Sequence, residues 1–347
     1  MLGAIALLCV PSAMRAQTTT VPAPLLRIRA EGTAGRPTIG VITHAVQLAS
    51  GVIVIADNVD SRLHYFSRTG SHMQSVGRDG GGPGEFKSVT WIGECARDSV
   101  FVFDRMQSRM SVFTADGRNV RQRVLARDPV MQACASNRTF ALVQLAGAPS
   151  PGVPARGNIV RVDGSDRELG RVNDVLLGRE RPLAAALQIA AAPDLLIYGA
   201  GDSARVFVLA DSSAPRSVRA GIALRTPTDS QRNAAIEQLV MSMPGSKADQ
   251  AITRRYARRT PFAPVLPAYS ALMFDDITRL LWVQQSVAGD GETVLERRTL
   301  TGALQATVRI PVELDVFSVR NNVLVARSTN ADGEQSLVLY RLTDSVR

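Results

Sequence analysis

Histidine, cysteine and lysine are scarce in this chain of 347 residues. It contains three histidines, three cysteines and two lysines, so arginine carries almost all of the formal charge of +9. The Cys and His clusters of structural zinc sites and the His-Glu-x-x-His motif of zinc hydrolases are absent. The Gly-x-Ser-x-Gly elbow of serine hydrolases is also missing. We therefore predict no catalytic, cofactor-binding or metal-binding residue.

Long apolar runs are missing as well. A bilayer-spanning helix needs about 20 consecutive apolar residues, and no segment reaches that length, so no transmembrane segment is expected. The composition, 45% hydrophobic and 20% charged, is that of a chain that buries a core and not that of a disordered protein. Arginine richness is as typical of a GC-rich genome as of a nucleic-acid-binding surface, and we predict no nucleic-acid partner.

One shorter apolar run, LGAIALLCV at residues 2–10, is followed by Pro11 and the sequence SAMRAQ. Its length suits the hydrophobic region of a secretory signal peptide, with a cut after Ala16. We expect a signal peptide over residues 1–16, a disordered leader over residues 17–24 and export to the periplasm or the extracellular space.

Two stretches of the chain repeat each other. IVIADNVDSRLHYFSRTG at residues 53–70 aligns with FVFDRMQSRMSVFTADG at residues 101–117 when the numbering is shifted by 47 positions. Each copy has an apolar strand, a polar turn opened by aspartate, an alternating strand and a glycine turn, as in one blade of a β-propeller. The matched pairs are Asp57 and Asp104, Ser61 and Ser108, Arg62 and Arg109, Phe66 and Phe113, and Gly70 and Gly117.

Later copies keep the rhythm of strands but less of the sequence. Counting strand–turn–strand units gives six, and residues 25–30 (LLRIRA) form one further strand that is left to complete the last blade. We therefore predict an all-β fold, a six-bladed β-propeller over residues 25–347. The later units lie at residues 131–144, 195–212, 280–302 and 323–342.

The first repeat and the segment after it resemble a known group. The string Asp-x-x-x-Ser-Arg-Leu-x-x-Phe-x-x-x-Gly, followed by VGRDGGGPGEF, is similar to NHL repeats and, more narrowly, to exported bacterial six-bladed β-propeller proteins. The strong part of the resemblance covers residues 40 to 120. It implies the propeller fold and brings little chemistry with it.

GRDGGGPGEF, residues 77–86, raises the question of a phosphate-binding loop. A P-loop needs Gly-Lys-Ser or Gly-Lys-Thr at the start of a helix, and a dinucleotide-binding loop also opens a helix. Here FKSVTWIG follows, and its β-branched and aromatic residues favour a strand. We predict a connector between blades, with Phe86 packed between them.

A helical pattern interrupts the strands at residues 226–259. Apolar residues recur there at helical spacing, and two further pairs have the spacing of capping boxes. We predict a helical insertion between blades 4 and 5, a hairpin that lies across one rim of the propeller. The apolar residues are Ile236, Leu239, Val240 and Met243, and the capping pairs are Thr228 with Gln231 and Ser246 with Asp249.

The same region is the most basic part of the chain, because residues 219–259 hold eight basic and three acidic residues. Arg254, Arg255, Arg258 and Arg259 crowd the end of the second predicted helix, and we predict a candidate anion-binding rim there. The alternative is a solvated helix face without a partner. The partner expected for the rim is an envelope protein or an anionic glycan.

Asp57 and Asp60, in DNVDS, suggest a calcium site at first sight. The matching blade has Asp104 but Gln107 in the second place, so we predict that Asp57 and Asp104 cap turns. The three histidines do not share a metal-ligand motif, and none is predicted to bind metal: His44, His64 and His72.

Cys95 and Cys134 remain once Cys9 is assigned to the signal peptide, an even pair in an oxidising compartment. The repeats place them at the same step of consecutive blades, where first strands lie side by side. We predict a disulfide between them. The alternative is two buried free cysteines that act as small apolar groups.

These features predict an exported, monomeric propeller that acts as a non-catalytic scaffold for ligand or protein binding at the cell envelope, without a cofactor. The alternative is a metal-dependent hydrolase or lyase with its site in the central channel. That alternative needs three or more carboxylate, amide or imidazole side chains that converge on one point near the axis.

Overall fold

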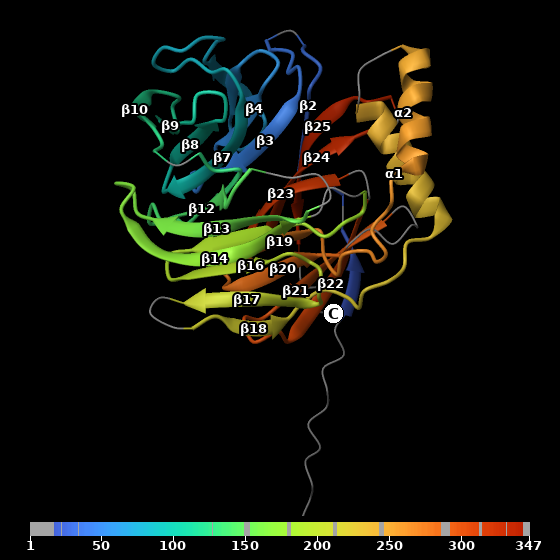
Figure 1. Cartoon of the computed structure of the whole chain (residues 1–347). Helices are drawn as coiled ribbons and strands as arrows, with labels where there is room; N and C mark the ends of the chain where they lie inside the picture. The colour runs from blue at the N-terminus through green and yellow to red at the C-terminus, as the bar shows by residue number, and fades with distance from the viewer. Residues whose placement is uncertain are drawn as a thin grey trace, which may run out of the picture.

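The computed structural model of the chain describes residues 17–21, 23–33, 35–126, 128–148, 153–178, 182–210, 214–242, 246–285, 292–311, 314–330 and 332–342. These residues form six β-sheets, the blades of a propeller, and two helices at the side of the ring (Figure 1). The six-bladed fold predicted from the repeats is confirmed. The predicted signal peptide, residues 1–16, lies outside the described residues. In the described part of the chain, no helix is long and apolar enough to cross a membrane.

Four of the blades are four-stranded antiparallel meanders in which strand follows strand along the chain. The polar and glycine turns of the repeat let the chain fold back after each strand. The strands are β3 (Ile42–Gln47), β4 (Ile53–Asp57), β5 (Arg62–Phe66) and β6 (His72–Val76); β7 (Val89–Ala96), β8 (Ser99–Asp104), β9 (Arg109–Thr114) and β10 (Asn119–Val124); β11 (Met131–Cys134), β12 (Phe140–Leu145), β13 (Ala155–Val162) and β14 (Glu168–Gly178); and β15 (Gln188–Ala192), β16 (Leu195–Gly199), β17 (Arg205–Ala210) and β18 (Arg216–Arg219).

The other two blades each take a strand from the N-terminal part of the chain. β2 (Leu26–Arg29) pairs antiparallel with β25 as the outer strand of the last blade, which confirms the predicted ring closure by residues 25–30. β1 (Gln17–Thr20) pairs in parallel with β22. The remaining strands of these blades are β19 (Ala271–Asp275), β20 (Leu280–Gln284), β21 (Glu292–Arg298) and β22 (Leu304–Pro311), and β23 (Leu314–Arg320), β24 (Val323–Thr329) and β25 (Gln335–Arg341).

The prediction of a disordered leader over residues 17–24 is wrong for Gln17–Thr20. β22 is the last strand of its meander, so its outer edge offers unpaired backbone groups. Three β-branched threonines favour an extended chain beside that edge, and Val21 donates a backbone hydrogen bond to Arg309 (N–O 2.9 Å). The N-terminal segment therefore adds a fifth strand to this blade.

The hydrophobic core lies between the blades. Both faces of each blade pack against a neighbour, so β4 and β16 are buried at every residue and show no alternation. Six clusters of buried apolar side chains, one for each pair of adjacent blades, make up this core. Phe86 is fully buried in the cluster between the β3–β6 and β7–β10 blades, as predicted.

The glycine-rich segment at residues 77–86 is a connector, as predicted, because it runs from β6 into β7. The buried side chain of Arg109, from the following blade, donates to the carbonyl oxygens of Gly81 (2.9 Å) and Gly82 (3.2 Å). Gly84 has a φ of +75°, in the left-handed region that favours glycine. The backbone carbonyl groups of this loop therefore bind a side chain of the same protein, Arg109.

The two helices, α1 (Asp229–Ser242) and α2 (Lys247–Arg259), lie in the chain between β18 and β19. Both begin next to the caps predicted from the sequence, where a side chain satisfies a free backbone N–H group of the first turn. The reciprocal pairs are Thr228 with Gln231 (2.9 and 3.2 Å) and Ser246 with Asp249 (2.9 and 3.3 Å).

The helical hairpin has a small core of its own. Ile236 and Val240 of α1 are buried against Ala257 of α2, with Leu239 partly buried beside them. Met243, the fourth apolar residue of the predicted face, lies outside the described residues. None of the six clusters between blades, as the described residues define them, contains a residue of either helix.

Removal of the hairpin is expected to leave the propeller folded. A short Gly-Ser linker in place of residues 229–259 keeps the stem of the insertion, where Leu266 donates a backbone hydrogen bond to Arg225. Because the helices pack chiefly against each other, urea denaturation should remain one cooperative transition with a midpoint close to that of the whole chain. Loss of that transition would show that the hairpin belongs to the core.

Candidate functional site

The mouth of the central channel holds a cavity of about 900 Å³. Its wall is built from the first strand of every blade, β3, β7, β11, β15, β19 and β23, and from the turns after several of them. These strands are innermost because each blade begins at the channel and adds its later strands outward. A cavity of this size has room for a small organic ligand.

Aromatic side chains from three blades line this cavity. The His44 ring lies 4.8 Å from the Phe317 ring and 6.3 Å from the Trp91 ring, centroid to centroid. Burial lowers the pKa of His44 to about 4, so the imidazole is neutral at neutral pH. Its Nδ1 atom has no hydrogen-bond partner among the described residues.

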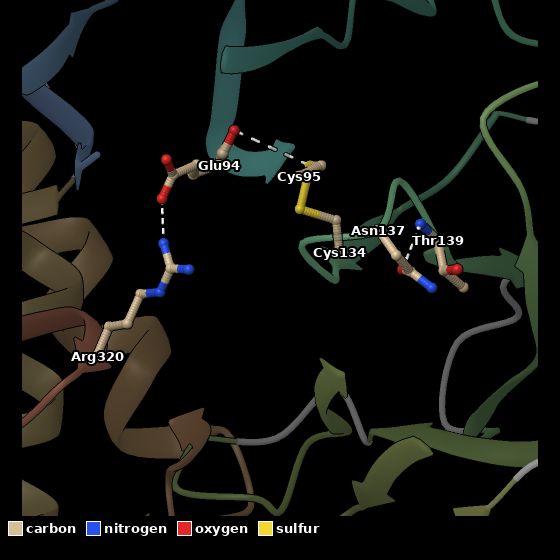
Figure 2. The surroundings of a disulfide bond; sticks show 7 residues. Glu94, Cys95, Cys134, Asn137, Thr139 and Arg320 are labelled. Atoms are coloured by element: carbon tan, nitrogen blue, oxygen red, sulfur yellow. Dashed lines mark hydrogen bonds and ion pairs between the residues drawn. A yellow bond between two sulfur atoms is a disulfide. The ribbon is translucent and has the colours of Figure 1, made fainter. Parts of the chain in front are cut away.

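A buried carboxylate reaches an arginine across the mouth of the channel (Figure 2). Glu94 of β7, whose side chain is 3% exposed, forms an ion pair with Arg320 at the end of β23. Arg320 Nε also donates to Asp276, after β19, over 3.1 Å. The second oxygen of Glu94 accepts from the backbone N–H groups of Ala49 (2.9 Å) and Asp98 (2.7 Å). The buried charge of Glu94 is therefore fully paired.

Contacts of this kind join turns of all six blades into one chain around the channel, which we name the mouth belt. Because its members link blade to blade, outward movement of any blade breaks at least one of them. Besides the contacts of Glu94, Arg320 and Asp276, the belt contains the disulfide of Cys95 and Cys134, the hydrogen bonds from Ser50 N to Asp98 (2.7 Å) and from Asn137 to the carbonyl of Pro193 (3.4 Å), and the ion pair of Arg279 with Asp194 (2.7 Å).

Cys95 and Cys134 form the predicted disulfide (Figure 2). Their Cα atoms are 5.4 Å apart, within the range that a disulfide requires. Cys95 lies near the end of β7 and Cys134 ends β11, so the bond joins innermost strands of consecutive blades, as the repeats predict. Beside it, the N–H group of Arg138 donates to the carbonyl of Cys95 (2.8 Å). The alternative of two free cysteines is wrong.

Asp57 and Asp104 cap turns, as predicted, and each also binds the chain just before its own blade. Asp57 accepts from the N–H groups of Val59 (2.9 Å) in the turn and Gly40 (2.7 Å) ahead of β3. Asp104 accepts from Lys87 (2.6 Å) ahead of β7. Both carboxylates are buried and engaged by backbone groups, so they belong to the framework of the blades.

His64 is buried beside Asp57. Its Nε2 lies 3.5 Å from Asp57, and its Nδ1 lies 2.8 Å from the Oγ of Ser75. That Oγ also lies 3.0 Å from His72 Nε2. Burial by itself raises the pKa of Asp57, but the nearby His64 imidazole and hydrogen bonds from backbone groups outweigh it and lower that pKa to about 2. None of these four residues lines the channel cavity, so their contacts stabilise the blade.

Metal-ligating side chains do not gather in the part of the chain that the structure describes. No group of three or more His, Cys, Asp or Glu side chains is placed there to hold an ion. His44 lies in the channel wall, whereas His64 and His72 lie in β5 and β6. These residues supply no ligand set for the alternative predicted from the sequence, a metal-dependent hydrolase or lyase with its site in the channel.

The four arginines of the candidate anion-binding rim lie on α2 and differ in their contacts. Arg254 donates two hydrogen bonds to Glu237 of α1 (2.7 and 2.6 Å). Arg255, Arg258 and Arg259 are exposed, and no described carboxylate lies within 4 Å of them. The structure therefore keeps three of the four arginines available to a partner.

Two large apolar side chains share this surface. Ile252 is 58% exposed and Tyr256 is 73% exposed. Residues three and four positions apart lie on one face of a helix, so Ile252, Arg255, Tyr256 and Arg259 form one surface, which we name the outer face of α2. Arg258 lies at its border. Singly exposed apolar residues are common, but two together beside unpaired arginines mark a candidate contact surface.

Sequence reasoning missed the channel cavity and its polar residues. Trp91, Glu94 and Arg320 belong to no local motif, and Glu94 and Arg320 are 226 positions apart. The sequence signal that could have found them is their position on the first strand of a blade, because the first strands of a propeller line its channel.

Residues 36–123 match the model of a family described as 6-bladed beta-propeller. They cover the β3–β6 blade and the β7–β10 blade except for the last residue of β10, and in these two blades the sequence repeat is clearest. No curated protein matches the chain.

Two solved structures resemble the chain along nearly its whole length. One is a member of the duf4221 family from Bacteroides vulgatus, with a TM-score of 0.57 and 10% identity over 93% of this chain and 98% of that one. The other is a candidate exported protein from Bacteroides fragilis, with a TM-score of 0.54 and 11% identity over 94% of this chain and 99% of that one. The chain is thus a six-bladed β-propeller, similar in fold to these bacterial proteins and, over residues 36–123, in sequence to the 6-bladed beta-propeller family.

Proposed function

We propose that the protein is an exported, non-catalytic scaffold that binds an acidic protein at the cell envelope through the outer face of α2. The observation that carries this proposal is that Arg255, Arg258 and Arg259 are exposed beside Tyr256, with no carboxylate within 4 Å among the described residues. Arginine and tyrosine dominate the binding energy of many protein interfaces. The apolar run at residues 2–10 and the candidate exported protein of the same fold support export.

The charges and the apolar side chains of this face have different roles in such a complex. Three like charges within two helical turns repel one another, and an acidic surface relieves that repulsion. The same potential steers the partner during encounter, so association slows as salt is added. Ile252 and Tyr256 supply apolar area that the complex removes from water. A partner protein uses both contributions, whereas a polyanionic glycan depends chiefly on the charges.

Substitution of the three free arginines by serine (R255S/R258S/R259S) is expected to weaken binding of an acidic partner by at least about tenfold at low salt. Arg254 stays in place because its pair with Glu237 holds α2 against α1. Polyglutamate serves as the acidic polypeptide and polygalacturonate as the anionic glycan, each immobilised and titrated with residues 17–347 at several salt concentrations.

The matched control removes the same charge elsewhere. R62S/R105S/R121S changes three exposed arginines of the β3–β6 and β7–β10 blades and should bind as the unchanged chain does. Equal weakening by both triple variants, or by neither, would favour a solvated helix face without a partner. Tyr256→Ala separates the two kinds of partner, because it should weaken polyglutamate binding and spare polygalacturonate.

A further inference from the structure

We propose that the cavity at the channel mouth is a second binding site, for a small organic anion that carries a ring. The ring lies against Trp91 and Phe317, and the acidic group reaches arginines at the edge of the cavity. This site is separate from the outer face of α2. The helical hairpin precedes the start of β19 in the chain, whereas Asp276 of the cavity wall follows the end of β19, so the two sites adjoin opposite ends of this strand.

Partly exposed aromatic side chains in the cavity wall favour a ligand that contains a ring. Trp91, Phe274 and Phe317 come from three different blades and are neither fully buried nor fully exposed. Water against apolar rings is unfavourable, and a flat or cyclic ligand displaces it. The gain grows with the apolar area that the ligand covers, and rings present such area with little loss of conformational freedom.

Uncharged polar groups in the wall can orient this ring. Gln47, Gln132 and Gln188 line the cavity, and their side-chain amides form no hydrogen bond with a described residue. The neutral imidazole of His44 also lines the cavity. A few convergent polar groups on an otherwise apolar wall are what fixes the orientation of a small ligand.

The charged residues of the wall favour an anion. Glu94 and Asp276 share the single charge of Arg320, so these three side chains together carry a net charge of −1. Arg68 and Arg341 also line the cavity, are exposed and have no described carboxylate within 4 Å. A guanidinium group binds carboxylate or phosphate through two parallel hydrogen bonds. With Arg97, which pairs with Asp98, four arginines and two carboxylates line the cavity, a net charge of +2, so the ligand is negative.

Two kinds of small molecule share this chemistry. An acidic sugar has a ring with an apolar face and hydroxyl groups that the three amides can bind. An aromatic acid has a flatter ring but leaves those amides to water. Experiments with one molecule of each kind distinguish the two sources.

Tryptophan fluorescence reports on the proposed site. The chain has two tryptophans, of which Trp91 lines the cavity and Trp282 is 1% exposed in a core cluster. Titration of residues 17–347 with trigalacturonate and with phenylacetate should give a saturable change in emission, with a Kd of about 1 mM or below for at least one of them. Maltotriose has rings without the charge and inorganic phosphate has charge without a ring. Both should bind at least about tenfold more weakly.

Variants assign the signal to the cavity. Trp91→Phe keeps a ring but removes the reporter, so emission should no longer change while calorimetry still detects the ligand. R68Q/R341Q should weaken the acidic ligand by about tenfold and leave maltotriose unaffected. R255S/R258S/R259S, on α2, is the control and should bind as the unchanged chain does. Equal binding of maltotriose or phosphate, or no saturable response to either acid up to about 10 mM, would overturn the proposal.

Discussion

Loss of strand β2 is expected to end the cooperative unfolding of the propeller. β2 is the outer strand of the last blade, and its pairing with β25 closes the ring. Ile28, at its centre, is 1% exposed in a cluster that also contains residues of the β3–β6 blade. Without β2, β25 has an unpaired edge and this cluster loses apolar contacts. The packing of the first blade against the last blade is therefore weaker.

Two truncated chains separate closure from the rest of the N-terminal segment. A chain that starts at residue 25 lacks β1 but keeps β2, and should unfold in one transition in urea. A chain that starts at residue 31 lacks both strands and should show a broad transition or none. A synthetic peptide of residues 23–31 should restore the transition, because an added strand can pair with the exposed edge of β25. A cooperative transition in the shorter chain without peptide would show that the ring does not need this closure.

The blades could be predicted from the sequence because each repeat marks its own turns. Asp57 and Asp104 recur at one step of two blades, and each holds its turn and the entry to its own first strand. Second strands are buried on both faces, so apolar runs such as β16 remain visible where the repeat has decayed. The helical hairpin was predictable for the opposite reason. Its apolar residues change to helical spacing, and polar caps precede both helices.

The channel mouth could not be predicted in this way. Glu94 and Arg320 meet only after six blades have closed into a ring, and each is an ordinary strand residue in its local sequence. The parallel pairing of β1 was missed because four residues carry little pattern and their partner is the free edge of β22. Cys95 and Cys134 were the exception, since they are the only two cysteines after the predicted signal peptide, and export would place them in an oxidising compartment.

Removal of the disulfide is expected to lower the free energy of unfolding by roughly 4 kcal/mol, the value that the chain-entropy model gives for a loop of about 40 residues. Cys95 and Cys134 are 39 positions apart, and the variant Cys95→Ala/Cys134→Ala releases that loop in the denatured chain. The folded chain keeps other contacts at this place. Arg138 still donates to the carbonyl of residue 95, and the ion pair of Glu94 with Arg320 remains. The variant should therefore fold as a propeller and unfold at lower urea.

Urea denaturation of the variant and of the unchanged chain, with and without reductant, measures this difference on residues 17–347. The reduced unchanged chain should resemble the variant, because both lose the same constraint on the denatured state. Thiol counting on the denatured, unreduced chain should find no free thiol, and two free thiols would contradict the bond. If the variant is as stable as the oxidised chain, the denatured state is already compact around these strands. The ion pairs and hydrogen bonds of the mouth belt then hold the channel mouth without the covalent link.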